Sequence, residues 1–191
     1  GHYRNGPSEK AGKIYKRNEI PAITASATSE SVTFENDWYF RVIPTNMTEA
    51  GFVANYIYRG MRKHAATIVY TNDDYGITLA EHFERTASSM GMKIKRKWEW
   101  DRAGDGLDRA KEIVAQLNAT DEPGVLFLAT HSSEGIKIIT TLKDDWESRP
   151  VSILGSYAFA RSFFIEIAEE YPREFSDPGY YSNNILFITP F

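Results

Sequence analysis

Short apolar runs alternate with amphipathic stretches along most of the chain, and this alternation constrains the fold more than any other feature. The runs are rich in β-branched residues, as are strands buried on both faces of a parallel sheet. Strands that alternate with helices predict βαβ units with right-handed crossovers, and therefore an α/β fold. The predicted strands are Ile20–Thr24, Thr67–Thr71, Lys93–Trp98, Val125–Ala129, Val151–Leu154 and Ile185–Thr189, and the predicted helices are Ser8–Asn18, Thr48–Lys63, Ile77–Met90, Leu107–Leu117 and Ser133–Trp146.

Local signals predict how some of these elements begin, end and face the core. Ala11, Ile14 and Tyr15 share one face of the first helix, so we expect that face to be buried. Thr48 is the first candidate for the N-cap of the second helix, and Asn46 is the alternative. The turn-forming residues 171–179 predict a loop between the last helix and the last strand.

One connection has two interpretations. The extended run Trp38–Thr45 contains Pro44 and leads directly into the second predicted helix. Such a connection joins a strand to a helix within one sheet, or it is a hinge that carries the chain from one lobe to another. Hydrophobic periodicity does not distinguish the two, because both contain a strand followed by a helix.

Composition excludes several classes of protein. The 191 residues include 22 Lys and Arg, 26 Asp and Glu, and no Cys, which gives a net charge of −4. Without Cys the chain forms no disulfide, thiolate metal site or cysteine nucleophile. The acidic balance disfavours broad nucleic-acid binding, so we expect no nucleic acid as a partner. No apolar run approaches the ~20 residues of a membrane span, so we expect no direct membrane insertion of this segment.

Candidate binding residues follow the predicted strands, because ligands of open α/β sheets bind beyond the carboxyl ends of the strands. Small and hydroxyl residues at 25–29 follow the first strand, and their free backbone N–H groups are suited to an anion. An ordinary strand-to-helix cap would have the same composition. Tyr75 follows the second strand, His131 follows the fourth and Tyr157 follows the fifth. Together these residues predict a binding cleft with aromatic and hydroxyl walls.

Catalysis has weaker support in the sequence. Asp73 and Asp74 could suggest a metal site, but acidic residues at a helix N-terminus are more commonly explained by the helix dipole. A hydrolase that uses His131 with a nearby Ser and one of these carboxylates is an alternative, although no Gly-x-Ser-x-Gly nucleophile elbow is present. The sequence has no zinc-type His spacing and no glycine-rich nucleotide motif. We therefore expect a binding protein with no metal and no cofactor.

Several segments together resemble one known family. They are Gly1-His2-Tyr3-Arg4-Asn5-Gly6, the segment Ile20-Pro21-Ala22-Ile23-Thr24-Ala25-Ser26-Ala27-Thr28-Ser29, the run Tyr39-Phe40-Arg41 with Pro44, and Asp74-Tyr75-Gly76. This set resembles the type I periplasmic binding proteins, in the branch that binds leucine, isoleucine, valine and related ligands for ABC transporters. The similarity extends over essentially the whole chain, and its most specific part lies in the first 45 residues.

The resemblance implies a two-lobed protein that closes on a small ligand. Residues 1–45 would be part of the first lobe, residues 46–189 would be the second lobe, and the hinge crossing would lie near residues 44–46. The first lobe would be incomplete, with further sequence before Gly1 and after Phe191. The implied function is a periplasmic or extracellular receptor for an amino-acid-like compound or an organic carboxylate, with a membrane permease as partner. A ligand-sensing domain of a signalling receptor is an alternative with the same fold.

The resemblance also implies roles for individual residues. The ligand carboxylate would be held by Asn5, Ser26, Ala27 and Thr28, where Asn5 replaces a Ser of the family. Tyr75 would be the aromatic wall of the cleft, and His131 would lie at or beside the next contact. The family's acidic partner for a ligand ammonium falls near Tyr157, which cannot neutralise a cation. Since a buried ammonium without a counter-charge costs several kcal/mol, a carboxylate without an ammonium fits as well as an α-amino acid.

Overall fold

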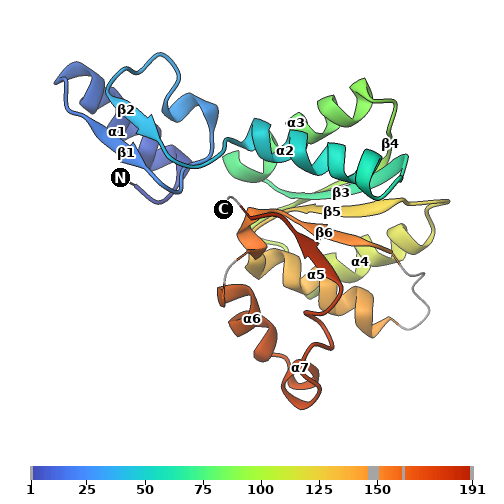
Figure 1. The fold of residues 1–191 in the computed structure, drawn as a ribbon. Helices are drawn as coiled ribbons and strands as arrows, with labels where there is room; N and C mark the ends of the chain where they lie inside the picture. Colours follow the sequence, from blue (N-terminus) through green and yellow to red (C-terminus); the bar gives the residue numbers. More distant parts are fainter. Residues whose placement is uncertain (1, 146–150, 161, 190–191) are drawn as a thin grey trace.

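A computed structural model, which describes residues 2–145, 151–160 and 162–189, contains two separate parallel sheets. Strands β1 (Ala22–Thr24) and β2 (Tyr39–Arg41) form a small sheet near the N-terminus. The second sheet has the strand order β4-β3-β5-β6-β7, and each neighbouring pair is parallel (Figure 1). Its strands are β3 (Ala65–Thr71), β4 (Lys93–Trp100), β5 (Val125–Ala129), β6 (Ile153–Gly155) and β7 (Ile185–Phe187). The predicted α/β class with parallel sheets is confirmed.

Helices cover both faces of the larger sheet. Helices α2 and α3 lie on one face, and α4, α5 and α6 lie on the other (Figure 1). Each group packs apolar side chains against the sheet. No helix among the described residues is both long and apolar enough to cross a membrane. The helices are α1 (Asn5–Arg17), α2 (Asn46–Asn55), α3 (Asp74–Ser89), α4 (Leu107–Asn118), α5 (Ser132–Asp144), α6 (Ser162–Glu169) and α7 (Pro172–Ser176), with short turns η1 (Glu30–Val32), η2 (Tyr56–Gly60, π-helical) and η3 (Tyr157–Phe159).

Some predicted boundaries are wrong. The second helix begins at Asn46, and its N-cap is Thr45, whose hydroxyl accepts a hydrogen bond from the backbone N–H of Thr48. Helix α7 occupies part of the predicted loop, because a Pro at the first position of a helix starts it as well as it starts a turn. Helix α6 was not predicted. The expected contribution of Trp146 to α5 lies outside the described residues.

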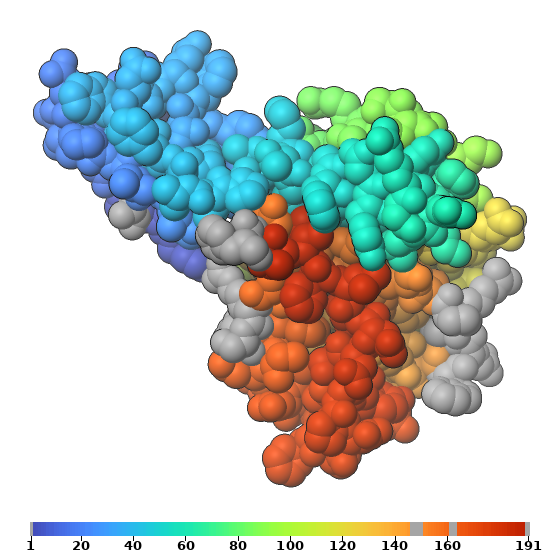
Figure 2. Space-filling model, viewed as in Figure 1, coloured from blue at the N-terminus to red at the C-terminus, as the bar shows by residue number. Residues whose placement is uncertain are grey.

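The N-terminal region (residues 2–44) has a small core of three buried apolar residues, Ala27, Val32 and Tyr39. Helix α1 packs here through its small residue Gly12, where a Cβ would lie 3.1 Å from the Tyr39 ring. The predicted apolar face of α1 is not buried as expected, since Ile14 is 59% exposed. Figure 2 shows this region as a distinct body at the side of the main region (residues 45–189).

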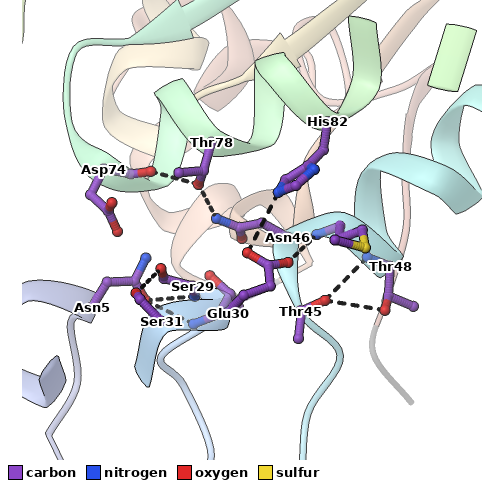
Figure 3. A network of polar contacts seen from close by, with 12 residues as sticks. Asn5, Ser29, Glu30, Ser31, Thr45, Asn46, Thr48, Asp74, Thr78 and His82 are labelled. Carbon is purple, nitrogen blue, oxygen red and sulfur yellow. Dashed lines mark hydrogen bonds and ion pairs between the residues drawn. The ribbon is translucent and has the colours of Figure 1, made fainter. Parts of the chain in front are cut away.

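The two regions meet through polar contacts around the start of α2 (Figure 3). The backbone N–H of Asn46 donates to the carbonyl of Thr28 at 2.9 Å, and its side-chain amide donates to the hydroxyl of Thr78. Glu30 accepts a hydrogen bond from the N–H of Met47 at 2.7 Å and lies 3.5 Å from the Nε2 of His82 in α3. These contacts hold the loop after β1 against α2 and α3. They therefore fix which residues of that loop face the space between the two sheets.

Candidate functional site

A cavity of about 220 Å³ lies between the two regions, at the carboxyl ends of strands from both sheets. Residues 3–5 and the loop after β1 line it from the N-terminal region. The loops after β3, β4, β5 and β6 line it from the main region. The lining residues are Tyr3, Arg4, Asn5, Ser26, Thr28, Tyr75, Arg102, His131, Ser132, Ser133, Tyr157 and Ala158.

The predicted site residues converge on this cavity with one exception. Asn5, Ser26, Thr28, Tyr75, His131 and Tyr157 all line it. Ala27 does not, because its side chain is fully buried in the small core with Val32 and Tyr39. A ligand contact by Ala27 stays a prediction, and the buried side chain leaves no room for that contact to be made by its methyl group.

The loop after β1 differs from the expectation of free backbone N–H groups. The Oδ1 of Asn5 accepts hydrogen bonds from the N–H of Thr28 at 2.8 Å and from the N–H of Ser29 at 3.1 Å. The hydroxyl of Thr24 accepts from the N–H of Ala27 at 3.0 Å, and from that of the preceding residue. The N–H groups of residues 26–29 are thus bonded within the protein, and the Asn5 side chain presents an acceptor to the loop where we expected a donor to the ligand.

On the opposite wall, His131 and Arg102 are held by two carboxylates. The Nε2 of His131 lies 2.8 Å from the Oδ2 of Asp73, and Arg102 donates from Nη1 to the same oxygen at 2.9 Å. Arg102 also donates from Nε to Glu134 at 3.0 Å. The ring of Tyr75 lies against that of His131, with 5.0 Å between the ring centroids. This arrangement fixes a cationic and aromatic wall that faces the N-terminal region.

The carboxylates behind this wall are ionised. Burial alone would raise the pKa of Asp73, but hydrogen bonds from His131, Gly76 and Thr71 hold it well below its ordinary value. Burial likewise opposes ionisation of Glu134, whose pKa is nevertheless lowered by Ser133 and Arg102. Both acids therefore keep their charge at neutral pH and orient the groups that line the cavity.

A different carboxyl group lies behind the Tyr157 side of the cavity. Glu49 of α2 is fully buried, and its Oε1 accepts a hydrogen bond from the backbone N–H of Tyr157 at 2.8 Å. Burial raises the pKa of Glu49 to about 8, and the hydrogen bond from the backbone N–H of Tyr157 offsets this only in part. Glu49 is therefore mostly neutral at pH 7 and positions the Tyr157 loop without supplying a full negative charge.

The loop after β6 is fastened by Phe159. Its ring lies over Gly135 and Gly155, where a Cβ on Gly135 would overlap the ring and a Cβ on Gly155 would lie 2.7 Å from it. The hydroxyl of Ser156 also donates to the carbonyl of Thr130 at 2.9 Å. These contacts join the loops after β5 and β6, so Tyr157 and His131 are presented from one rigid unit.

The hydroxyls near His131 are engaged elsewhere. Ser132 donates to the carbonyl of Ala158 at 2.5 Å, and Ser133 donates to Glu134 at 2.8 Å. A nucleophilic Ser would need to share its proton with the His ring. The His131–Asp73 pair required by the hydrolase alternative is present, but neither adjacent Ser donates to His131. No group of His, Asp and Glu among the described residues is arranged to hold a metal ion.

Arg102 was missed as a site residue although the sequence carries a signal for it. The predicted strand ended at Trp98, whereas β4 extends to Trp100. Arg102 follows that end, at the position where the other loops place their cavity residues. Glu49 was missed because a carboxyl group on a helix gives no sign in the sequence that it will be buried.

Comparisons with known proteins agree with this architecture. Residues 1–145 match the family described as the receptor family ligand binding region. No curated protein matches the chain. An ABC transporter substrate-binding protein from Desulfitobacterium hafniense is similar, with a TM-score of 0.70 and 23% identity over 83% of this chain and 46% of that one. A second structure of such a protein from that organism, in complex with Leu, has a TM-score of 0.69 and 21% identity over 95% and 59% of the two chains.

A leucine-binding protein from Thermotoga maritima is also similar, with a TM-score of 0.75 and 17% identity over 89% of this chain and 47% of that one. This chain therefore spans roughly half the length of the solved structures it matches. At these identities the likeness concerns the fold, while the family match covers most of the sequence. The chain belongs to the receptor family ligand binding region family and has the fold of the type I periplasmic binding proteins.

Proposed function

We propose that this chain contributes the binding site of a receptor for a small organic carboxylate, amino-acid-like or otherwise, in an ABC uptake system. The observation that carries the proposal is the cavity between the carboxyl ends of both sheets, lined from both regions. Ligand sites of open α/β sheets lie at this edge. The similar structures are of substrate-binding proteins for ABC transporters, and one of them is in complex with Leu.

The proposed mechanism is closure of two lobes around the ligand. Residues 1–45 would belong to the first lobe, residues 46–189 to the second, and residues 44–46 to the hinge. A ligand that contacts both walls binds the closed arrangement better and shifts the population toward it. A membrane permease would then recognise the closed form, in the periplasm or outside the cell. A sensing domain of a signalling receptor would use the same closure and differ in its partner.

We further propose that the site binds without catalysis. The Ser132 and Ser133 hydroxyls donate away from His131, which supports a binding role for that ring. Replacement of His131 by Ala is then expected to weaken binding, with no chemical change in any bound compound. Mass spectrometry of a ligand incubated with the wild-type protein tests this directly. A product whose formation depends on His131 would favour the hydrolase alternative.

A thermal-shift screen of the intact protein against a metabolite library tests the proposed function. A ligand at 100 times its Kd is expected to stabilise the folded state by about 2.7 kcal/mol. Calorimetry with Thr28→Ala then tests the site, because the Thr28 hydroxyl makes no hydrogen bond to another described residue and faces the cavity. Loss of one neutral hydrogen bond predicts a roughly three- to tenfold weaker affinity.

Ser88→Ala is the matched control for that variant, since Ser88 is exposed on α3 and does not line the cavity. Its affinity is expected to equal that of the wild type. An unchanged affinity in Thr28→Ala would remove the N-terminal region from the site. No shift with any compound in the library would contradict the proposed function as a whole.

A further inference from the structure

We infer that the anionic group of the ligand binds at the wall of the main region, to Arg102 and the amino end of α5 beside His131, and not to the loop after β1. The inference rests on the proposed function and assigns a ligand class to the same cavity: an organic anion without an adjacent ammonium. It reverses the ligand orientation that the resemblance implied, in which the loop after β1 holds the carboxylate.

The loop after β1 lacks the free backbone N–H groups that would hold a carboxylate. Asn5 already bonds the N–H groups of Thr28 and Ser29 through one amide oxygen, at 2.8 and 3.1 Å. That oxygen takes the position, in front of the two N–H groups, that an oxygen of a ligand carboxylate would need. Since Thr28 and Ser29 are buried, opening these bonds for a ligand would leave the Asn5 oxygen without its partners. The loop therefore offers a ligand the Thr28 hydroxyl, and residues 25–29 include no cation.

The opposite wall offers a guanidinium in a fixed orientation. Arg102 uses Nε and Nη1 to reach Glu134 and Asp73, which leaves other N–H groups of its guanidinium for a ligand. His131 lies beside it, with its Nε2 2.8 Å from the same Asp73 oxygen. A guanidinium anchored in this way binds a carboxylate without first having to be ordered.

The amino end of α5 adds to the positive potential at the same place. His131 is the N-cap residue of this 13-residue helix, and its side chain does not cap the helix. Ser132 and Ser133 form the first turn and line the cavity, so the positive end of the helix dipole points toward it. The helix end supports the site that Arg102 forms and does not define it alone.

The lining of the cavity carries no acid. Asp73 and Glu134 hold Arg102 in place but are not among the described residues that line the cavity. Behind Tyr157, the Glu49 carboxyl group is fully buried and mostly neutral at pH 7, because burial raises its pKa to about 8. A ligand anion therefore meets donors, whereas a ligand ammonium would lose its hydration and meet no carboxylate.

A series of compounds with one carbon skeleton tests the inference by calorimetry on the intact protein at pH 7. The probes are 4-methylpentanoate, 4-methyl-2-oxopentanoate, L-leucine and 3-methylbutylamine. We expect both acids to bind more tightly than leucine, and the amine not to bind. Arg102→Gln is expected to weaken the acids at least tenfold, which is more than the effect of Thr28→Ala. If the library screen identifies another anion, that anion replaces the series in the same comparison.

Two further variants keep the test independent of folding. Arg102→Gln/Glu134→Gln removes both members of an ion pair, so no charge is left unbalanced by that pair, and it is expected to show the same loss of affinity. Arg109→Gln is the control, because Arg109 also contacts two carboxylates, on Glu112 and Asp105, but does not line the cavity. Its affinity is expected to lie within twofold of the wild type.

Three results would overturn the inference. In the first, Arg102→Gln and the double variant both bind the acids within twofold of the wild-type affinity. Another is tighter binding of leucine than of its oxo acid by tenfold or more. The third is a library screen that yields only neutral or cationic ligands, which would leave a small-molecule receptor with a different ligand class. A screen without any ligand contradicts the proposed function itself, and so the two failures are distinguishable.

Discussion

The two regions of the molecule both pair parallel strands and pack helices beside them, yet different interactions stabilise them. In the main region, every residue of β5 is buried, and apolar clusters cover both faces of the sheet. In the N-terminal region, the apolar core is limited to Ala27, Val32 and Tyr39. Hydrogen bonds make many of the other contacts that hold this region together. They include those from the Arg41 guanidinium to the carbonyls of Ala27 and Ser29.

The N-terminal region also leaves large apolar side chains exposed to solvent. Ile23 and Phe40 of the small sheet are 58% and 54% exposed, and Phe34 beside it is 70% exposed. Each buried CH₂ contributes about 0.8 kcal/mol, so these side chains add little to the stability of the N-terminal region as it stands. A βα pattern in the sequence therefore specifies topology in both regions, while the apolar area that becomes buried decides how stable each region is.

The largest difference between the regions is expected for a pair of Phe→Ala variants. Phe127 is fully buried in β5, with its ring 4.6 Å from that of Phe83, so Phe127→Ala is expected to cost about 3–5 kcal/mol. Phe34→Ala is expected to change the free energy of unfolding by less than about 0.5 kcal/mol. Urea denaturation of the intact protein measures both. A cost for Phe34→Ala similar to that of Phe127→Ala would show that Phe34 is covered in solution.

A second comparison concerns two acids, Glu49 in the main region and Glu30 in the N-terminal region. Burial raises the pKa of Glu49 from 4.5 to about 8, whereas burial of Glu30 is outweighed by hydrogen bonds, chiefly from Met47, and its pKa is lowered. Folded Glu49 thus holds a proton that the unfolded chain has released. The stability from this group is complete below about pH 4.5 and falls by about 1.4 kcal/mol per pH unit up to about pH 8.

Glu49→Gln removes that titration while it keeps an oxygen to accept from Tyr157. The variant is expected to gain stability relative to the wild type as the pH rises from 5 to 8, measured by denaturant unfolding at each pH. Glu30→Gln serves as the control and is expected to lose stability relative to the wild type, or stay equal, as the pH rises. Parallel pH profiles for Glu49→Gln and the wild type would mean that Glu49 is ionised when folded.

Asn5→Ala tests whether polar bonds hold the N-terminal region together. The change leaves the buried N–H groups of Thr28 and Ser29 without their acceptor, at an expected cost of about 2 kcal/mol. Hydrogen exchange is expected to speed up for the amides of residues 22–41 and to remain slow in β5. Asn18→Ala is the control, because its side chain makes only an exposed bond to the carbonyl of Ile14. Uniform acceleration in both regions would mean that they unfold together.

The smallest effect is expected at the contact that joins the regions. Glu30 and His82 lie 3.5 Å apart, and such pairs contribute about 0.5 kcal/mol. A double-mutant cycle with Glu30→Gln and His82→Gln, measured by urea denaturation, is expected to give this coupling at low salt and less of it at 1 M salt. Coupling that does not change with salt would assign the contact to hydrogen bonding in place of charge.

Much of the fold could be predicted from sequence because the main region follows its periodicity. The predicted strand Val125–Ala129 has the bounds of β5, since a central strand is apolar at every position. Prediction was poorer where tertiary contacts override local pattern. Ile14 was expected inside α1 but is exposed, because the small Gly12 and not the apolar stripe lies against Tyr39. The N-cap at Thr45 was missed since three residues within 45–48 have side chains able to cap a helix.

The position of the site was easier to predict than its chemistry. Reading the residues after each strand identified part of the cavity lining on both sides, because parallel strands end at one edge. The residues found in this way are Ser26, Thr28, Tyr75, His131 and Tyr157. The side-chain partners were not predictable in this way. Asn5 lies 23 residues before Thr28 in the chain, and the use of its oxygen as an acceptor depends on how α1 packs. Whether an amide donates to a ligand or accepts from its own protein is decided by that packing.

The ring of Phe159 has a consequence for how this scaffold diversifies. Its contacts with Gly135 and Gly155 hold the loop after β6 in place, whereas Tyr157 of the same loop lines the cavity. Phe159 therefore holds the loop, and Tyr157, two positions before it, contacts the ligand space. Mutations that exchange Tyr157 leave the anchor in place, so new ligand preferences are accessible in single steps. A library varied at Tyr157 and Arg102, with Phe159 and both glycines kept, changes the residues that line the cavity and keeps the contacts that hold the loop after β6.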